Sequence, residues 1–308
     1  IVADSMALWG KLIAKKLNIP FVSSTTTFAF NKDSAKVMQG SLKDLVKILT
    51  QMRKAKKHIK RLQENGYDIK NVIEIIQNDN DTNTIVYTSP EFQPYSDTFS
   101  DKYVFVGPSI RPTNNVFEKT REKLVYISMG TVNNDMTIFY KNCIDAFKDS
   151  NYQVVLSVGS QVDIKHLEEY VTKLEGTAQF HVLTWVDQIA VLEKSDVFIT
   201  HCGMNSVSEA LYFKVPLVIY PQTNEQKGVA FRINELGAGI YLIRDSVSDV
   251  QMAVKELLQR VEYKKQANEI SVSFSKCGGS RAAAEKILDI ALDNKLRYVK
   301  QFDKSQFD

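Results

Sequence analysis

The sequence contains few cysteines and no long apolar run. Three cysteines occur in 308 residues, at positions 143, 202 and 277, and none belongs to a Cys-x-x-Cys pair. This number and spacing argue against a disulfide framework or a zinc site, so the thiols are predicted to be reduced. No apolar run approaches the roughly 18 residues needed to span a bilayer, and no cleavable leader is visible. These absences predict a cytoplasmic protein.

A strong excess of either charge is also absent. The chain has 39 lysines and arginines against 36 aspartates and glutamates, a formal net charge of +3. So small a charge argues against nucleic acid as the natural partner. With 44% hydrophobic and 24% charged residues, a chain of this length can bury two cores of ordinary size. The composition therefore favours a soluble enzyme.

Strand-like and helix-like segments alternate from Lys123 onward. The strand-like segments are 124–128, 153–158, 179–184, 197–200, 217–220 and 239–243. Between them, residues 138–148, 164–174, 205–213 and 226–236 carry apolar side chains at three- and four-residue spacing, which predicts crossover helices. This alternation predicts an α/β fold with a parallel sheet that is covered by helices on both faces.

The segment before residue 107 is less regular. Strand signals occur at 1–3, 21–23, 85–88 and 103–106, with an amphipathic helix predicted over 7–17. This is fewer than the about five to six strands of an average sheet, and the chain begins inside an element. We therefore expect a first domain that is incomplete at its N-terminus.

A polar segment separates the two predicted domains. Residues 107–115 are interrupted by Pro108 and Pro112, as is typical of a linker between compact units. We place the first domain at 1–107, the linker at 108–121 and the second domain at 122–292. Ser280 is predicted to cap a helix over 282–292, and the tail at 293–308 is expected to return to the first domain and to fray at its end.

The decapeptide Thr-His-Cys-Gly-Met-Asn-Ser-Val-Ser-Glu at 200–209 is the most informative motif. It closes an apolar strand and opens a helix, whose free N–H groups and positive dipole end attract a diphosphate. Gly203, Asn205 and Ser206 would let the phosphates approach the backbone, and His201 would add a side-chain donor. Glu209, one turn further on, would accept hydrogen bonds from a ribose diol. A tight turn without a ligand is the alternative interpretation.

Two neighbouring loops strengthen this interpretation. Trp185, Val186 and Gln188 follow one predicted strand, and Glu225 with Gln226 follow another. Ligands of open α/β sheets bind at the carboxyl ends of strands. Trp185 offers a face on which a base can stack, although a half-buried loop anchor would look the same, and the Glu225–Gln226 pair offers acceptors and donors for sugar hydroxyls.

These motifs together resemble the donor-binding box of family-1 UDP-glycosyltransferases, especially the bacterial macrolide-type branch. Ser128-Met129-Gly130-Thr131 and Gly278-Gly279-Ser280 also match loops of that family. The resemblance implies a GT-B fold, in which two Rossmann-like doubly wound domains bind the acceptor and the UDP-sugar. It also implies inverting transfer of a hexose, with glucose the first expectation, to a hydroxyl of a small hydrophobic acceptor such as a macrolide or flavonoid.

By the same resemblance, Trp185 stacks on uracil, Val186 contacts the base edge through its backbone, and Glu209 holds the ribose. Glu225 and Gln226 hold the sugar. The remaining donor-site residues are Ser128, Gly130, Thr131, Gln188, His201, Gly203, Asn205 and Ser206. Asp187 departs from the family's commoner Trp-x-Pro-Gln, which implies a change in loop stiffness and a weaker grip on the base.

The catalytic base is expected outside this sequence. In the resembled family a histidine near the N-terminus takes the proton of the acceptor hydroxyl, and an aspartate fixes its tautomer. Asp4 matches that aspartate, because it ends a strand in Val-Ala-Asp-Ser-Met; a helix N-cap is its alternative role. The four histidines present, at 58, 166, 181 and 201, are poor substitutes for the base, which we expect upstream of Ile1.

No metal or other cofactor is expected, since preorganised donors can stabilise the UDP leaving group. Asp79-Asn80-Asp81 lies between a predicted helix and a predicted strand, where a turn is favoured over an Asp-x-Asp metal site. The basic segment 52–62 favours a solvated helix face over docking on an anionic membrane. We expect a monomer or weak dimer.

Two rival functions remain open at this stage. The chain could be a non-catalytic UDP-sugar-binding subunit that needs a partner polypeptide, or a UDP-sugar epimerase of related architecture. An epimerase would leave Trp185 and the Glu225–Gln226 pair without an explanation.

Overall fold

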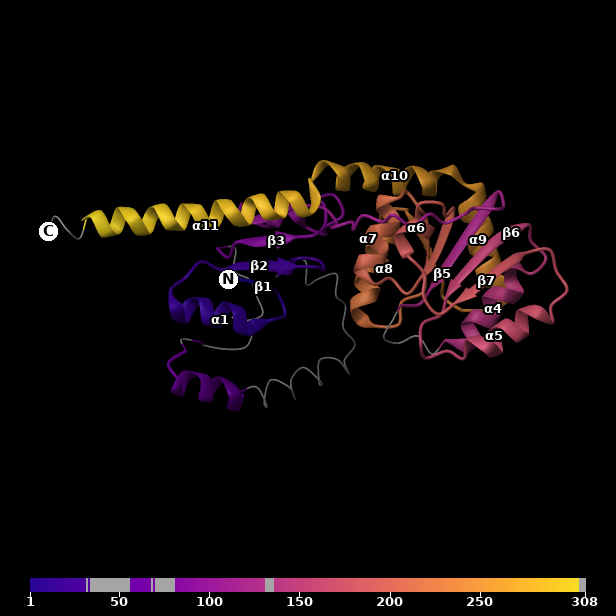
Figure 1. Cartoon of the computed structure of the whole chain (residues 1–308), viewed down its shortest axis with the longest axis horizontal. Helices are drawn as coiled ribbons and strands as arrows, with labels where there is room; N and C mark the ends of the chain where they lie inside the picture. The colour runs from indigo at the N-terminus through magenta and orange to yellow at the C-terminus, as the bar shows by residue number, and fades with distance from the viewer. Residues whose placement is uncertain (32, 34–55, 68, 70–80, 131–135, 305–308) are drawn as a thin grey trace. The chain divides into compact units, whose positions relative to one another are not determined.

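The computed structural model describes residues 1–31, 33, 56–67, 69, 81–130 and 136–304, with residue 8 and residues 294–304 described only through their backbone. The chain divides into two compact units (Figure 1). Unit 1 contains Ile1–Ser109 and Ser273–Asp308, and unit 2 contains Ile110–Val272. Residues 273–292, which the sequence analysis placed with the second domain, thus belong with unit 1.

Unit 1 is built on a parallel sheet in the order β1-β2-β3-β4. Its strands are β1 (Val2–Asp4), β2 (Val22–Thr25), β3 (Thr84–Val86) and β4 (Tyr103–Phe105), joined by α1 (Leu8–Leu17), the short 3₁₀ helix η2 (Ser96–Thr98) and other segments. Helix α11 (Gly279–Lys304) packs on this sheet, because Ala283 and Ile290 share a buried cluster with Val22, Ile85 and Val106. The carboxyl ends of β1 and β2 meet where Asp4 pairs with Ser24.

Three predictions for this unit need correction or fall outside the described residues. Helix α11 begins at Gly279 rather than after a cap at Ser280, because Gly278 and Gly279 both have positive φ (86° and 62°) and turn the chain into the helix. Residues 56–64 are helical, while the rest of the basic segment 52–62 lies outside the described residues. Asp79 and Asn80 also lie outside them.

Unit 2 contains a six-stranded parallel sheet in the order β10-β9-β8-β5-β6-β7. Its strands are β5 (Lys123–Ser128), β6 (Tyr152–Ser157), β7 (Gln179–Leu183), β8 (Val197–Thr200), β9 (Leu217–Ile219) and β10 (Gly239–Tyr241). If the strands of this unit are numbered 1 to 6 along the chain and read from β7, the order is 3-2-1-4-5-6, the arrangement of a Rossmann fold. The order in which successive strands are added therefore reverses between β5 and β8. The ligand crevice is expected at the carboxyl ends of these two strands.

Helices cover the sheet of unit 2. They are α4 (Thr137–Phe147), α5 (Ile164–Thr172), α6 (Gln188–Leu192), α7 (Met204–Tyr212), α8 (Asn224–Glu235), α9 (Val247–Gln259) and α10 (Val261–Lys276), the last of which continues into unit 1. The central strand is apolar without alternation: Leu124, Val125 and Tyr126 are at most 1% exposed. Such continuous burial is typical of parallel strands that are covered on both faces.

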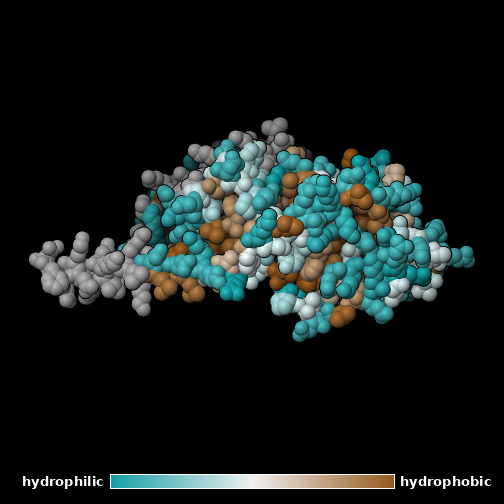
Figure 2. All heavy atoms as spheres, turned by 90° about the horizontal axis from the view of Figure 1, so that it is seen from above, coloured by the Kyte–Doolittle hydropathy of each residue, from teal (hydrophilic) through white to brown (hydrophobic). Residues whose placement is uncertain are grey.

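The surface is mixed in character. On the face drawn in Figure 2, hydrophobic residues form separate brown patches among teal hydrophilic ones. Within the described residues, none of the helices is both long enough and apolar enough to cross a membrane.

Candidate functional site

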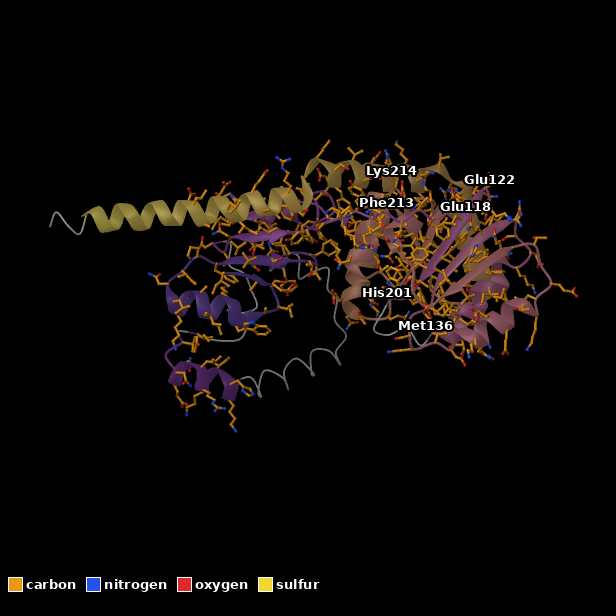
Figure 3. The ribbon with its side chains drawn as sticks, in the orientation of Figure 1. Glu118, Glu122, Met136, His201, Phe213 and Lys214 are labelled. Atoms are coloured by element: carbon orange, nitrogen blue, oxygen red, sulfur yellow. The ribbon has the colours of Figure 1, made fainter. Side chains whose placement is uncertain are left out.

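The candidate site lies at the carboxyl edge of the unit 2 sheet, where β5 and β8 are adjacent. The two strands run in register to the pair Ser128–Thr200, so the loops that follow them leave the sheet side by side. Figure 3 shows His201, just after β8, on the same edge of unit 2 as Met136, whereas Glu122, just before β5, lies on the opposite edge. The decapeptide thus lies at the position where Rossmann folds bind nucleotides.

His201 is held between two glycines from these two loops. A Cβ atom added to Gly130 would lie 2.7 Å from Nε2 of His201, and one added to Gly203 would lie 2.8 Å from the same atom. Real Cβ atoms do not approach other atoms so closely, so both glycines are required for the ring to occupy this place. Gly130 also has φ of +86°, a conformation that favours glycine. Both glycines were predicted from the sequence, but this steric reason was not.

The turn that follows His201 exposes the start of α7. Cys202 has φ of 67°, an uncommon left-handed conformation for a non-glycine residue, and Gly203 occupies the N-cap position without a capping side chain. Helices α4 and α6 also lack a side-chain cap, whereas α5, α8 and α9 are capped by the side chains of Asp163, Thr223 and Ser246. The first amides of α7 therefore remain available to an anion, and the helix dipole adds to their attraction.

The imidazole of His201 is largely withdrawn from solvent. Its Nδ1 is buried and has no hydrogen-bond partner among the described residues. Burial lowers the pKa of His201, an effect that the Ser128 backbone partly offsets. The ring is therefore neutral near pH 7, where it can donate one hydrogen bond through its protonated nitrogen.

This lowered pKa predicts a pH dependence of stability. Just below the ordinary histidine pKa of about 6.5, the folded chain binds fewer protons at His201 than the unfolded chain, so the free energy of unfolding falls as the pH falls from 7 towards 5. The His201→Gln variant lacks this contribution. Urea denaturation at pH 7.5 and 5.0 should therefore show a smaller loss of stability in the variant than in the wild type, and equal losses would contradict the assignment.

Gln188 connects three elements of the site. Its Nε2 donates to Glu209 Oε2 (2.5 Å) and to Ser206 Oγ (3.2 Å), both on α7, and its Oε1 accepts from the hydroxyl of Tyr126 (3.2 Å). Burial raises the pKa of Tyr126, which keeps that hydroxyl protonated, and the ring stacks on Phe198 at 4.7 Å between centroids. The structure thus brings together Gln188, Ser206 and Glu209 as predicted and adds Tyr126, which the apolar strand pattern concealed.

Glu209 is partly buried within this network. Burial raises its pKa, while the hydrogen bond from Gln188 and the charge of Arg111 oppose the shift. One carboxylate oxygen is engaged by Gln188, which fixes the direction in which the group points. A carboxylate held in this way is suited to accept hydrogen bonds from a diol.

Trp185 and Val186 occupy the loop between β7 and α6. Trp185 is 68% exposed, so its ring is open to a flat ligand, whereas the side chain of Val186 is 8% exposed and anchors the loop. The anchor role considered for Trp185 therefore belongs to its neighbour. An exposed indole at the carboxyl edge of a sheet offers a stacking surface for a base.

Glu225 and Gln226 lie in the first turn of α8, and one of them already has a structural task. Thr223 and Gln226 form a reciprocal capping box, in which Gln226 Oε1 accepts from the backbone of Gln222 (2.7 Å) and Thr223 (3.0 Å). The predicted acceptor capacity of Gln226 is thus used by the helix, and its amide nitrogen is the group left to offer a donor. Glu225 and Asn205 are exposed.

Two predicted residues remain, Thr131 and Asp4. Thr131 lies outside the described residues. Asp4 is in unit 1, where its Oδ1 accepts from the backbone of Met6 (2.8 Å). Its alternative role as a helix N-cap is wrong, because α1 begins later and its N-cap position is Ala7.

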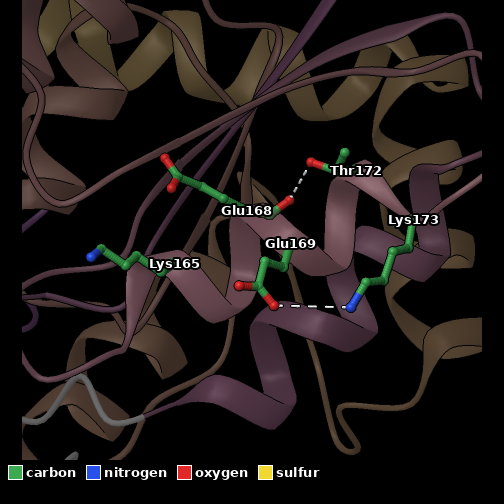
Figure 4. A pocket seen from close by; sticks show the side chains of 5 residues that line it. All are labelled: Lys165, Glu168, Glu169, Thr172 and Lys173. Carbon is green, nitrogen blue, oxygen red and sulfur yellow. Dashed lines mark hydrogen bonds and ion pairs between the residues drawn. The ribbon is translucent and has the colours of Figure 1, made fainter.

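Two other features of the described residues bear on alternative sites. A surface hollow on α5 is lined by Lys165, Glu168, Glu169, Thr172 and Lys173 (Figure 4). Four of these residues are on α5 and Lys173 is its C-cap, and the Glu169–Lys173 pair is 3.9 Å apart at the surface, so the hollow is a gap between solvated side chains. No group of three or more His, Cys, Asp or Glu side chains in the described part of the chain is arranged to hold a metal ion.

Comparison with known proteins shows the family of the chain. The family model of the UDP-glucoronosyl and UDP-glucosyl transferases matches residues 116–275. The chain is 35% identical over 301 residues to the uncharacterized UDP-glucosyltransferase YojK of Bacillus subtilis. The matched region covers 94% of this chain and 72% of that protein. It is 36% identical to the NDP-glycosyltransferase YjiC of Bacillus subtilis, over 93% of this chain and 71% of that protein.

Solved structures show the same architecture. The glycotransferase of kitacinnamycin superposes with a TM-score of 0.79 at 24% identity, over 94% of this chain and 75% of that one. With its two parallel-sheet α/β units, the chain has the GT-B fold of glycosyltransferases. From the family match and the identities above, it belongs to the UDP-glucoronosyl and UDP-glucosyl transferase family, whose members are UDP-dependent glycosyltransferases.

Proposed function

We propose that the chain is an inverting hexosyltransferase that moves a hexose, glucose in the first instance, from a UDP-sugar to a hydroxyl of a small hydrophobic acceptor such as a macrolide or flavonoid. The observation that carries this proposal is the uncapped start of α7 with His201 between Gly130 and Gly203. Relatives of this chain include the oleandomycin glycosyltransferase of Streptomyces antibioticus, whose name refers to a macrolide.

The donor is proposed to bind along the carboxyl edge of the unit 2 sheet. The diphosphate accepts hydrogen bonds from the backbone amides of Gly203, Asn205 and Ser206. Uracil stacks on Trp185. Glu209 accepts hydrogen bonds from the ribose, and its carboxylate is already oriented for this by Gln188. Glu225 and the amide nitrogen of Gln226 face the sugar.

Departure of UDP is proposed to need no metal ion. As the glycosidic bond breaks, negative charge grows on the β-phosphate, and preorganised donors stabilise that charge. A neutral His201, the first amides of α7 and the positive end of the helix dipole supply such donors. Because these groups are fixed before the reaction, they need little reorganisation when the charge develops.

Inversion requires direct attack of the acceptor oxygen on the anomeric carbon. We propose that Asp4 orients a histidine that is not part of this sequence, and that this histidine takes the hydroxyl proton as the new bond forms. Support for Asp4 is its position at the carboxyl end of β1, with one carboxylate oxygen fixed by the Met6 amide.

The test is incubation of the protein with UDP-glucose and a panel of macrolides and flavonoids, followed by mass spectrometry of the products and calorimetry of UDP binding. A glycoside product supports transfer. Binding of UDP without turnover supports a donor-binding subunit that needs a partner polypeptide, and an altered free sugar nucleotide supports epimerisation. Failure to bind UDP at all would refute the donor site and the proposal with it.

A further inference from the structure

Asp187 occupies the N-cap position of α6 but does not cap the helix. Its φ and ψ of −72° and 97° are those of a capping residue, and aspartate is among the preferred N-caps, yet its side chain makes no hydrogen bond to the helix amides. The carboxylate is nevertheless buried, with 8% of the side chain exposed. A buried carboxylate that leaves the nearest amides without a cap must be satisfied elsewhere.

Its partners come from the start of unit 2, more than 70 residues earlier in the chain. Oδ1 of Asp187 accepts from Nη2 of Arg111, and Oδ2 accepts from Thr113 Oγ1 and Asn115 Nδ2, each at 2.6 Å. The Thr113 hydroxyl oxygen accepts in turn from the backbone of Asn115 (3.0 Å). We call Asp187 with Arg111, Thr113 and Asn115 the Asp187 clasp.

The clasp keeps the carboxylate of Asp187 ionised. Burial alone would raise the pKa of Asp187, but the hydrogen bonds from Thr113, Asn115 and Arg111 outweigh it and lower the pKa to about 2. The carboxylate is therefore ionised at every pH at which the enzyme is expected to work. Hydrogen bonds to a charged group are stronger than those between neutral groups, so three of them restrain the backbone at residue 187.

Residue 187 lies in the middle of the proposed base and ribose contacts. Trp185 and Val186 precede it immediately, and Gln188, which orients Glu209, follows it. The charge of Arg111 also reaches the site, because it opposes the rise in the pKa of Glu209 that burial causes. A group that fixes residue 187 thus fixes the stacking ring on one side and the ribose contact on the other.

We propose that the Asp187 clasp is a positioning device for the nucleotide, in which residues 111–115 hold the 185–188 loop in the conformation that binds the base and ribose of the donor. Asp187 acts through Trp185 and Gln188 and does not touch the reacting atoms. This proposal rests on the function proposed above. It also reverses the expectation from sequence, because the departure from Trp-x-Pro-Gln replaces a stiff proline with three long-range hydrogen bonds.

Asp196 provides a matched control. It also ties the beginning of unit 2 to the sheet, since its Oδ2 accepts from Lys119 Nζ (2.6 Å) and from the backbone of Leu124 (2.8 Å). Leu124 lies near the start of β5, and Glu118, next to Lys119, is on the opposite edge of unit 2 from His201 in Figure 3. If UDP affinity depends only on tethering or on overall stability, substitution of either aspartate should lower it. If it depends on donor positioning, only substitution of Asp187 should lower it.

The experiment compares Asp187→Asn, Asp187→Ala and Asp196→Asn in a Trp9→Phe background, where Trp185 is the remaining tryptophan of the two in the chain. UDP affinity is measured by calorimetry, and mobility of Trp185 by time-resolved fluorescence anisotropy without ligand. For both Asp187 variants we expect a rise of about tenfold in the UDP dissociation constant and faster local motion of Trp185. Asp196→Asn should change neither, even where its thermal midpoint falls equally.

A double-mutant cycle gives the second readout. Thr113→Val should weaken UDP binding in the wild-type background and have little further effect in Asp187→Ala, because both act through the same contact. Full additivity, or unchanged UDP affinity and Trp185 motion in Asp187→Ala, would overturn the clasp. If the wild type fails to bind UDP while Trp185 still loosens in the Asp187 variants, the proposed donor site fails, and the clasp is then reduced to a structural tether.

Discussion

Replacing His201 by alanine is expected to raise the dissociation constant of UDP by about one hundredfold, or about 2.7 kcal/mol. The ring lies between the loops that follow β5 and β8, with Nε2 directly between Gly130 and Gly203. Because burial lowers its pKa, it donates as a neutral group in a poorly solvated place, where a hydrogen bond to a charged phosphate contributes about 1.5–3 kcal/mol. Calorimetry with UDP measures the effect on binding directly.

His166→Ala is the control for this variant. His166 is on α5, and its Nε2 is 2.7 Å from Nζ of Lys141 at the surface. The substitution removes the same side chain away from the predicted site, so UDP affinity should stay within about twofold of the wild type. Equal affinities of the wild type and His201→Ala would remove His201 from the phosphate site and leave only the helix start as a candidate.

Gly203→Ala is expected to reduce UDP affinity by about tenfold or more without straining the backbone. Gly203 has φ of −62°, which alanine adopts readily, so the whole effect must come from the added methyl group. That methyl group would lie 2.8 Å from Nε2 of His201 and would force the ring out of its place. Titration of the variant with UDP, followed by calorimetry, measures the loss.

Two comparisons make this prediction specific. Gly228→Ala adds the same methyl group within α8, where nothing lies within 4 Å, so it should leave UDP binding unchanged and stabilise the helix by up to about 1 kcal/mol. In the His201→Ala background the Gly203 substitution should have little further effect, because the ring with which it clashes is absent. An undiminished loss in that background would show that Gly203 acts on the phosphate directly.

The strands and most helices were predictable because their signals are local. All ten predicted strands are present with ends shifted by at most two residues: β8 lies at Val197–Thr200 as predicted, and β6 begins at Tyr152 instead of Gln153. Apolar runs and three- and four-residue spacings reflect burial that is uniform along an element. Helices α6, α9 and α10 were not predicted; α6 has only five residues, too short for its spacing to be read.

The candidate site was predictable where one segment carries it and unpredictable where distant segments meet. His201, Gly203 and Glu209 belong to one decapeptide, so a single motif indicated them together. Tyr126 carried no signal, since a buried tyrosine in an apolar strand looks like any core residue until its hydroxyl is placed 3.2 Å from Gln188. The motif did not reveal the structural task of Gln226, whose oxygen caps α8.

The sequence by itself determined which strands and helices follow one another along the chain. It also determined the Rossmann-like class and the segment at which a nucleotide is expected to bind. Only the tertiary structure decided that Gly130 and Gly203 enclose the same imidazole, and that Asp187 turns away from its helix to bind Arg111, Thr113 and Asn115. The physical reason is the distance along the chain between the residues that interact. Periodicity and capping depend on neighbours within a few residues, whereas these contacts depend on which strands the sheet places side by side, and that order is set by the packing of the whole unit.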